Sequence, residues 1–499
     1  MRSSNAVRLA LAAILVLTAT VWTACNNANT GASSPTAATG GKVSIITKSE
    51  DARKEFLQGR DLSERLLAQD SLEHFDKALA LDPDFASAEL ARANNSPTAK
   101  EFFEHLNKAV SLADKASDGE RLFILANQAG ANGDVRKQKD SLDKLVAAYP
   151  NDERAQFTLG NYYFGQQEYR SAIEHYKKAT ELAPNYSAAY NILGYAYRQQ
   201  DDYANAEQAF KKYVELIPND PNPYDSYAEL LLKMGRFDES IAQYRKALSI
   251  DSHFVPSHFG ISADLTYMGK PQDAEAELGK MVEQARNDGE LRTALFGLAV
   301  VAADSGKLDK ALLEMDKEFA VAEKKNDPAA MAADLQAKGN ILAEMQRYDQ
   351  ANQQFDRSLK FVEDSSLSQE IKDNAKLQHH YNLTALAIGK KDYAAAKTHA
   401  EEFRQGAEAS KNPAQVKLAH ELAGRIALAQ KDYEKAIAEL EQANPQDPRN
   451  LYRLGQAHDG KGEHTKAQEF YSRAAKFNSL PALNYAFIRT KAEKMAKKA

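Results

Sequence analysis

The 499-residue chain has few of the residues that build covalent or metal-bound frameworks. It has one cysteine, Cys25, so it cannot form an internal disulfide framework or a metal site made of several cysteines. Its formal net charge of −6 is small for this length. That charge gives no reason to expect nucleic acid as a partner, because nucleic-acid binders usually carry a concentrated basic face.

Motifs for catalysis are missing as well. No HExxH sequence occurs, and His379 and His380 are adjacent, so on a helix they would point about 100° apart and could not share one metal ion. The stretch GQAHDGKG at 455–462 approaches a phosphate-binding loop, but Gly462 stands where Ser or Thr should hold magnesium. The acidic pair at 201–202 falls in an expected turn. We therefore predict no enzymatic activity, no cofactor and no metal site.

The N-terminus has the layout of a secretory signal. Arg2 and Arg8 precede an uncharged apolar stretch that begins at Leu9, and small residues stand before Cys25. The apolar stretch is shorter than the ~20 residues that cross a bilayer. Residues 1–24 are therefore predicted to be a signal peptide.

The cysteine at the end of this signal is the expected point of membrane attachment. The segment resembles a bacterial lipoprotein signal, which implies that cleavage leaves Cys25 as a lipid-bearing N-terminus. An uncleaved anchor and secretion with a free Cys25 are the alternatives. The small, polar residues that follow predict a flexible tether over residues 25–50. By resemblance to Gram-negative lipoproteins, Asn26 is compatible with sorting to the outer membrane.

A fixed period organises the rest of the chain. The stretch YRSAIEHYKKATELAPN at 169–185 returns in outline as YANAEQAFKKYVELIPN at 203–219. Pro150, Pro184 and Pro218 follow one another at intervals of 34 residues. A constant period of this size is typical of stacked repeat proteins.

Each repeat is expected to be a pair of helices. Residues 165–169 form a polar, glycine-containing turn, and Pro184 ends the second helix. Gly160 and Ala172 lack bulk, so the two helix axes can approach each other closely. The apolar positions three or four apart are Leu159, Gly160 and Tyr163 in the first helix, and Ala172, Tyr176 and Ala179 in the second.

This pattern resembles the tetratricopeptide repeat, which implies an all-α fold, an α-α superhelix of helical hairpins. We expect about twelve hairpins: degenerate ones over 51–118, regular ones over 119–286, and longer, looser ones over 287–480. NNSP at 94–97 should cut one helix short. The later copies need longer helices or loops, because their small residues are spaced 40, 45, 40 and 31 apart, at Ala311, Ala351, Ala396, Ala436 and Ala467.

The chain ends in a basic segment. Residues 481–499 begin with Pro481 and then read as a helix, which we predict to cap the repeat array, since such arrays need a polar terminal element. The alternative is contact with an anionic membrane or partner through Arg489, Lys491, Lys494, Lys497 and Lys498.

The resemblance also implies a binding surface, because the first helix of each pair lines the concave side of such superhelices. The candidate partner-binding groove combines aromatic, amide and charged side chains: Phe157, Asn161, Phe164, Asn191, Tyr195, Arg198, Asp225, Glu229, Leu232, Phe259 and Tyr267. A carboxylate clamp of the kind known in chaperone adaptors is not expected, because its slots hold Phe157, Asn161, Ile192 and Ser226, of which only the asparagine fits.

These features together predict an exported, lipid-anchored scaffold of the bacterial cell envelope that binds a protein or peptide partner in its groove. One alternative is a structural spacer or assembly subunit that uses its ends and its convex face. The other is a glycan-handling or enzymatic protein, for which no motif was found.

Overall fold

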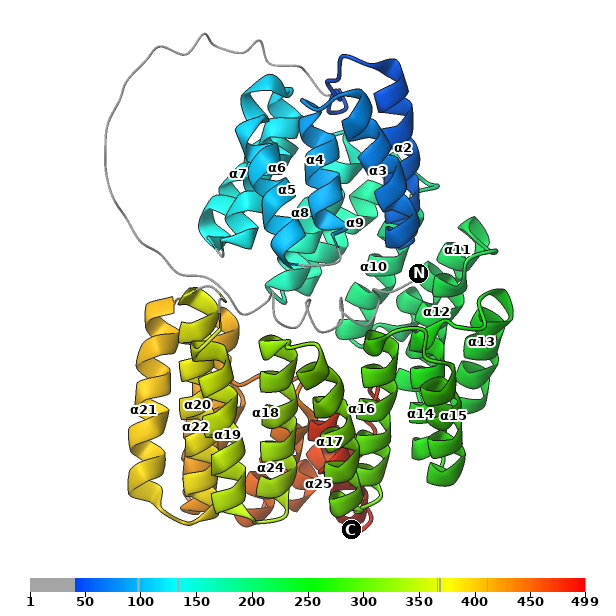
Figure 1. Ribbon diagram of the computed structural model, residues 1–499. Coiled ribbons are helices and arrows are strands. Elements are labelled where there is room, and N and C mark those ends of the chain that lie inside the picture. The colour runs from blue at the N-terminus through cyan, green and yellow to red at the C-terminus, as the bar shows by residue number, and fades with distance from the viewer. Residues whose placement is uncertain are drawn as a thin grey trace. The chain divides into compact units, whose positions relative to one another are not determined.

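The computed structural model describes residues 41–96, 99–132, 134–365, 367, 369–410 and 412–498 (Figure 1). Within these ranges all regular elements are helices, and no strand occurs. The predicted signal peptide, Cys25 and the tether up to residue 40 lie outside the described residues. Among the helices in the described ranges, none combines the length and the apolar character needed to cross a membrane.

The chain forms two compact units that divide between Leu230 and Leu231, within helix α12. Unit 1 is a stack of helical hairpins. Its helices are α2 (Glu50–Glu64), α3 (Ala68–Leu81), α4 (Ala86–Asn94), α5 (Ala99–Ser111), the short 3₁₀ turn η1 (Ala113–Lys115), α6 (Asp118–Ala131), α7 (Val135–Ala148), α8 (Glu153–Gly165), α9 (Tyr169–Leu182), α10 (Ser187–Gln199) and α11 (Tyr203–Leu216), followed by α12 (Pro221–Lys233).

Unit 2 continues the alternation of first and second helices. Its helices are α13 (Phe237–Ile250), α14 (Val255–Tyr267), α15 (Pro271–Gln284), α16 (Asp288–Asp304), α17 (Leu308–Lys324), α18 (Pro328–Glu344), α19 (Tyr348–Glu363), α20 (Gln369–Gly389), α21 (Tyr393–Ser410), α22 (Pro413–Ala429), α23 (Tyr433–Leu440), α24 (Pro448–Gly460), α25 (His464–Ala475), α26 (Leu483–Ala486) and α27 (Arg489–Ala496). Counted along the described chain, α2 to α25 make twelve helix–turn–helix pairs, which confirms the expected fold class.

The close approach of paired helices depends on small residues, as the sequence predicts. A Cβ added to Gly160 on α8 would lie 2.6 Å from the ring of Tyr176 on α9. Gly194 on α10 approaches Phe210 on α11 in the same way, at 2.8 Å. Both rings are fully buried, so each forms the centre of its hairpin. Tyr163 lies beside them and stacks on the ring of His175, as expected of a space-filling residue.

The turn inside most hairpins contains one residue with a left-handed backbone. Gln167, Asp201, Gly235 and Gly269 have φ between +56° and +76° and are spaced at the 34-residue period. Beyond them the spacing widens and then narrows again, at Gly306, Gln346, Lys391, Lys431 and Gly462. The last four intervals are 40, 45, 40 and 31 residues, equal to those of the small alanines.

Longer helices, rather than longer loops, account for the looser spacing in unit 2. Helices α8 and α9 have 13 and 14 residues, whereas α16, α17 and α18 have 17 each and α20 has 21. The turns keep their length because the left-handed residue always follows the first helix by the same short step. At the other end of the chain, α4 has only 9 residues, as NNSP predicts.

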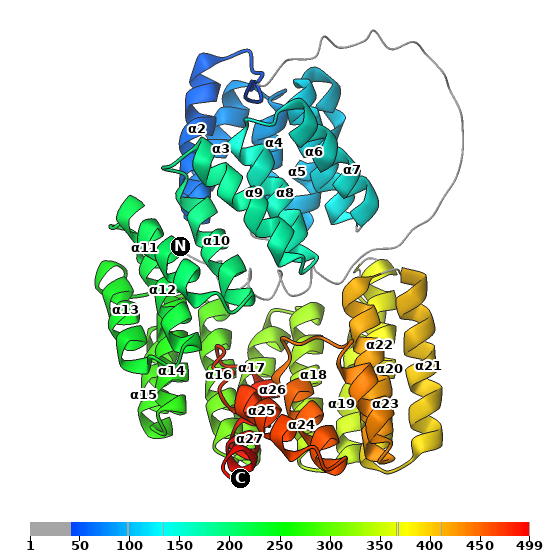
Figure 2. The same ribbon diagram turned by 180° about the vertical axis from the view of Figure 1, so that it is seen from behind.

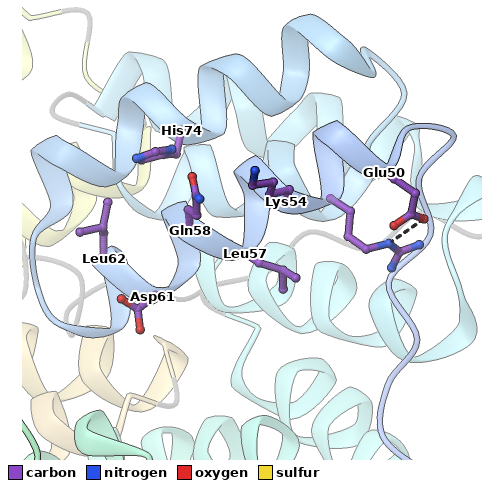
Figure 3. A pocket seen from close by; sticks show the side chains of 8 residues that line it. Glu50, Lys54, Leu57, Gln58, Asp61, Leu62 and His74 are labelled. Carbon is purple, nitrogen blue, oxygen red and sulfur yellow. Dashed lines mark hydrogen bonds and ion pairs between the residues drawn. The ribbon is translucent and has the colours of Figure 1, made fainter.

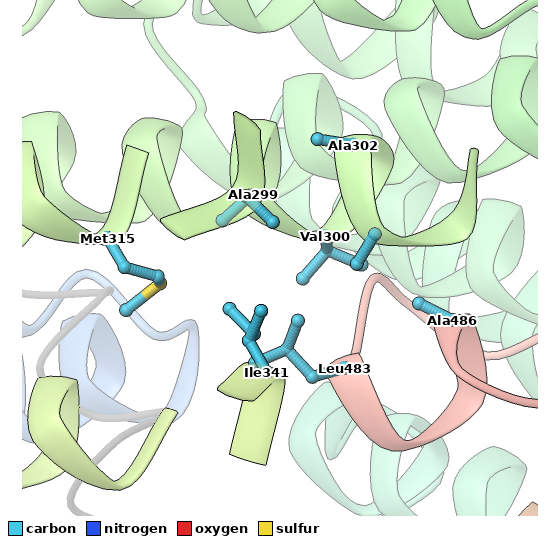
Figure 4. Close-up of a cluster of buried hydrophobic side chains, with 9 residues drawn as sticks. Ala299, Val300, Ala302, Met315, Ile341, Leu483 and Ala486 are labelled. Atoms are coloured by element: carbon cyan, nitrogen blue, oxygen red, sulfur yellow. The ribbon is translucent and has the colours of Figure 1, made fainter. Parts of the chain in front are cut away.

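The C-terminal segment differs from the single capping helix that the sequence predicts. It forms two short helices, α26 and α27, of 4 and 8 residues. Helix α27 packs on α25, which is the expected capping position, but α26 packs on α16 (Figure 2). Leu483 and Ala486 of α26 join a core cluster with Val300 of α16 and Ile341 of α18 (Figure 4). The segment therefore connects the last hairpin of unit 2 to the middle ones.

The described part of the predicted tether is held against unit 1. Residues 42–48 are extended, and the N–H groups of Val43 and Lys48 donate to Asp152 and Asp82, each at 2.9 Å. Within the tether predicted over residues 25–50, these two backbone donors therefore have fixed acceptors.

Candidate partner-binding surface

The predicted groove residues all lie on first helices of hairpins. We call the side of a unit made by these helices its first-helix face. Phe157, Asn161 and Phe164 lie on α8; Asn191, Tyr195 and Arg198 on α10; Asp225, Glu229 and Leu232 on α12; Phe259 and Tyr267 on α14. The structure separates them into an accessible group, a buried group and the two residues of α14, of which Tyr267 contacts the C-terminal segment.

An ion pair at the C-terminal end of α10 connects two of the predicted helices. Arg198 donates from Nη1 to Glu229 Oε2 of α12 at 2.9 Å, and its guanidinium lies 4.6 Å from the ring centroid of Tyr195. The Tyr195 ring in turn packs edge-on against Phe210 at 5.1 Å. About one fifth of the Arg198 side chain stays exposed, so the cation is held in place at the surface. Arginine over an aromatic ring is a common anchor in protein interfaces.

The accessible residues of α8 extend this surface. Phe164 is half-buried and packs against Tyr169 at the start of α9, at 5.4 Å. Asn161 is exposed, and its Oδ1 accepts a hydrogen bond of 2.8 Å from the Tyr176 hydroxyl. Phe157 is half-buried between Tyr176 and Tyr186, so it also supports the core. Asn161 and Phe164 therefore keep surface that a partner can reach.

Three predicted groove residues are buried, which corrects the expectation that they line an open groove. Asn191, Asp225 and Leu232 retain 5%, 4% and 1% of their exposure. Their positions face neighbouring helices rather than solvent, because the periodicity of one helix does not show which other helices pack against it.

Of the two predicted residues of α14, Phe259 is half-buried and Tyr267 is covered by the C-terminal segment, which is a second correction. Phe259 packs in the cluster of Leu278 and Ala294, and a Cβ on Gly297 would lie 3.1 Å from its ring. The Tyr267 hydroxyl donates to the carbonyl of Ser479 at 2.5 Å. The C-terminal segment thus occupies the first-helix face of unit 2 at α14.

The contacts of this covering segment are both apolar and ionic. Arg489 of α27 donates two hydrogen bonds to Asp304 of α16, at 2.7 and 2.5 Å, and both side chains are buried. Lys491 pairs with Glu344 of α18. Between α26, α14 and α16 only a cavity of about 10 Å³ remains, close to the smallest space that holds one water molecule. The C-terminal segment therefore packs on α14 and α16 as tightly as side chains pack in a protein core.

Further along the same face of unit 2, arginines surround a buried carboxylate. Glu421 of α22 retains 1% exposure and accepts hydrogen bonds from Tyr381 at 2.6 Å and Arg453 at 2.8 Å. Burial acts against its ionisation, but the charges of Arg453, Arg449 and Arg425 lower the pKa of Glu421 to about 2. The cluster joins α20, α22 and α24 and keeps a surplus of positive charge, because its three arginines face two carboxylates, Glu421 and Asp447.

Sequence reasoning missed the tyrosines that begin second helices. Tyr169 and Tyr203 lie near enough to Arg198 for its charge to affect their pKa values, which burial raises. A signal was present, because Tyr also begins α19, α21 and α23. At the last of these, Tyr433 packs against Gly460 at the end of the next first helix. A tyrosine at this position is thus a recurring contact between consecutive hairpins.

A shallow hollow of about 630 Å³ lies on α2, beside α3 (Figure 3). Lys54, Gln58 and Asp61 line it from one face of the helix, with Leu57 and His74 beside them. Its charges have mixed signs, and Leu57 is 38% exposed. Throughout the described residues, no group of three or more His, Cys, Asp or Glu side chains is arranged to hold a metal ion.

The repeats are those of a known class. Tetratricopeptide-repeat models match residues 157–221, 222–254 and 427–483. The chain therefore contains tetratricopeptide repeats, a fold of protein-interaction scaffolds, and the accessible surface on α8 and α10 lies within the first match.

Several solved structures are similar to parts of the chain. MamA is 24% identical over 33% of this chain and 91% of its own, with a TM-score of 0.30. A tetratricopeptide repeat protein from Parabacteroides merdae is 14% identical over 52% and 99%, with a TM-score of 0.38. YrrB, described as a TPR protein with an unusual peptide-binding site, is 19% identical over 36% and 91%, with a TM-score of 0.27. No curated protein matches the chain.

Proposed function

We propose that the chain is an exported, lipid-anchored scaffold that binds a protein or peptide partner through the first-helix face of unit 1. The observation that carries this proposal is the Tyr195–Arg198–Glu229 cluster, with Phe164 and Asn161 beside it. Aromatic rings and arginine bury much area with few rotors, so they are frequent anchors of partners. The corresponding face of unit 2 supports no such role at α14 and α16, because the chain's own C-terminal segment covers it.

Export and anchoring enter the proposal from the N-terminal sequence. Basic residues, an apolar stretch and small residues precede Cys25, which would carry the lipid. The scaffold would then work at the cell envelope, with Asn26 favouring the outer membrane. The test is the distribution of full-length chain and Cys25→Ser between membranes and soluble fractions, together with the mass of the N-terminal peptide. An unmodified N-terminus in the native chain would remove the anchor from the proposal.

Partner binding is tested by placing a photo-crosslinking amino acid at Asn161, which is exposed on the first-helix face. The matched control position is Glu181, which is exposed on the second helix α9. We expect a crosslinked partner at position 161 and none at position 181. The crosslink should weaken at least tenfold when Arg198→Ala and Phe164→Ala are combined, because both anchors are then gone.

A structural spacer is the second candidate, and the hollow on helix α2 favours it. Leu57 lines this hollow and is 38% exposed, and Leu66 in the turn after α2 is 41% exposed. A spacer would give crosslinks from Leu57 rather than from Asn161, and it would tolerate the Arg198 and Phe164 substitutions. The two crosslinking positions therefore distinguish the candidates within one experiment.

A further inference from the structure

Residues 42–48 form an extended strap along unit 1, across the N-terminal ends of the first helices α6 and α8. Their exposure alternates: Val43, Ile45 and Thr47 are half-buried, while Lys42, Ser44, Ile46 and Lys48 are exposed. This two-residue period is that of a β-strand, although the strap pairs with no other strand in the described chain. Side chains of the unit must therefore satisfy its backbone.

The strap's backbone donors go to acidic side chains of the first, third and fourth hairpins. The N–H of Val43 donates to Asp152 before α8, the N–H of Ile46 to Glu120 of α6, and the N–H of Lys48 to Asp82 after α3. The distances are 2.9, 3.1 and 2.9 Å. These bonds involve the main-chain N–H groups of the bound segment and do not depend on its side chains. They fix its register.

We call the surface made by Asp82, Asp84, Glu120, Asp152 and Glu153 the acidic ledge. All but Asp84 retain 5% exposure or less. Burial acts against ionisation of Asp82, but the hydrogen bonds from Thr47 and Lys48 hold its pKa below the ordinary value. Buried carboxylates are costly without donors, so the ledge needs an occupant.

Charge also selects what can lie there. Lys115 pairs with Asp84, and Arg154 pairs with Glu153, which leaves the ledge with surplus negative charge. The strap supplies two more cations, because Lys48 pairs with Asp84 and Lys42 with Glu153 at 2.7 Å. A segment without such flanking cations would not balance the ledge.

Shape adds a third requirement at Gly119 of α6. A Cβ on Gly119 would lie 2.6 Å from the Cγ1 atom of Val43, so the absence of a side chain there makes room for a β-branched one. Val43 also packs against the cluster of Leu142 and Leu159, and Ile45 packs in the cluster of Phe56 and Phe85. The strap thus shows the ledge taking an extended peptide by backbone, charge and shape together.

We infer that the acidic ledge is an exchangeable peptide-binding site whose resident occupant is the strap. Its outside partner is an extended, lysine-flanked segment of another protein with β-branched side chains at alternate positions. The strap is joined to the folded unit only through Ser49, so it can leave without unfolding a helix. A tethered segment competes at an effective concentration of about 1 mM, which keeps the ledge closed to weak or dilute peptides.

The test uses the full chain and a fluorescent peptide with the sequence of residues 41–49, GKVSIITKS. The strap is weakened by Val43→Ser combined with Ile45→Ser, which removes its inward side chains. The matched control is Ile46→Ser, which changes an outward side chain that is 48% exposed. We expect the peptide to bind the weakened chain at least tenfold more tightly than the native chain or the control. Equal affinities with folded proteins would overturn the inference.

Two further measurements keep the result specific. Adding Gly119→Val to the weakened chain should abolish peptide binding, because the new side chain fills the Val43 site. A peptide with both lysines replaced by glutamate should not bind.

If the weakened chain does not fold, hydrogen exchange on the native chain decides whether the strap is exchangeable. Peptide at 1 mM, on the order of the tethered concentration, should then speed exchange of the Val43, Ile46 and Lys48 amides. Unchanged rates would overturn the inference.

Discussion

The two units differ in the contacts that hold their own first helices together. In unit 2 an apolar segment with a buried ion pair, Arg489–Asp304, lies across α14, α16 and α18. In unit 1 an ion pair links the distant first helices α2 and α8, with Arg154 donating to both oxygens of Glu64 at 2.7 and 3.0 Å. An apolar segment that packs over the first helices makes their surface inaccessible to a partner. A partly exposed ion pair between two first helices leaves most of that surface accessible.

The largest expected effect comes from breaking the closure of unit 2. Asp304→Ala removes the buried carboxylate of Arg489 and leaves it the more exposed Glu493, which should lower the free energy of unfolding by about 3 kcal/mol. The measurement is urea unfolding followed by circular dichroism, in which the transition of unit 2 should move.

The counterpart in unit 1 is Glu64→Ala. Both partners of that pair keep more than a fifth of their side chains exposed, so the loss should stay near 1 kcal/mol or below. If Asp304→Ala and Glu64→Ala lowered the free energy of unfolding by similar amounts, the two ion pairs would be equivalent and the proposed difference between the units would be wrong.

The second prediction concerns the contacts between the two helices of a hairpin, which are close in both units. Gly160→Ala brings a methyl group to 2.6 Å from the fully buried Tyr176 ring. Such overpacking should cost about 1–3 kcal/mol, because the ring has no free space to enter. Thermal unfolding measures it. Gly165→Ala is the matched control, since nothing lies within 4 Å of its added Cβ, and it should be nearly neutral.

The repeat fold could be predicted because its signal is local and recurs. Gly160, Ala172 and Tyr176 stand at fixed spacing within one hairpin, and a contact between helices 16 residues apart in sequence repeats with each period. The longer helices of unit 2 could also be predicted from the sequence, because Ala311, Ala351 and Ala396 keep their place relative to the turn while the period grows.

The candidate surface was predicted less well because its accessibility depends on distant segments. Nothing near Tyr267 in the sequence indicates that Ser479 will cover its hydroxyl 212 residues later. In the same way, Asp152 reads as an ordinary helix N-cap, yet it also accepts a hydrogen bond from Val43. Local periodicity assigns a residue to a helix face, and long-range packing decides whether that face stays open.

The third prediction uses a pair of buried carboxylates in unit 2. Arg292 of α16 donates to both oxygens of Asp334 at 2.7 Å and lies 3.2 Å from Glu318. Burial, together with the charge of Asp334, raises the pKa of Glu318 to about 8 from an ordinary value of 4.5. One guanidinium therefore serves two acids, and Glu318 holds a proton at neutral pH.

The sign of the pH dependence follows from this raised pKa. The stability contributed by protonated Glu318 is complete below pH 4.5 and is lost as the pH rises through about 8. Glu318→Gln should remove this dependence, so between pH 6 and 9 the native chain should lose on the order of 1–2 kcal/mol more than the variant. Urea unfolding at several pH values measures the difference. The control, Glu401→Gln at an exposed pair, should keep the native profile.

The smallest expected effect is in the turns, where the two units should behave alike. Lys431 in unit 2 and Gln167 in unit 1 have φ of +64° and +62°, a region that costs a side-chain-bearing residue roughly 1–2 kcal/mol. Glycine removes that cost but loses more freedom on folding, so Lys431→Gly and Gln167→Gly should each gain about 0.5–1 kcal/mol. The reverse change, Gly462→Ala at φ +85°, should lose a similar amount. Melting temperatures of the three variants test this, and a gain in only one unit would show that the turns are not equivalent.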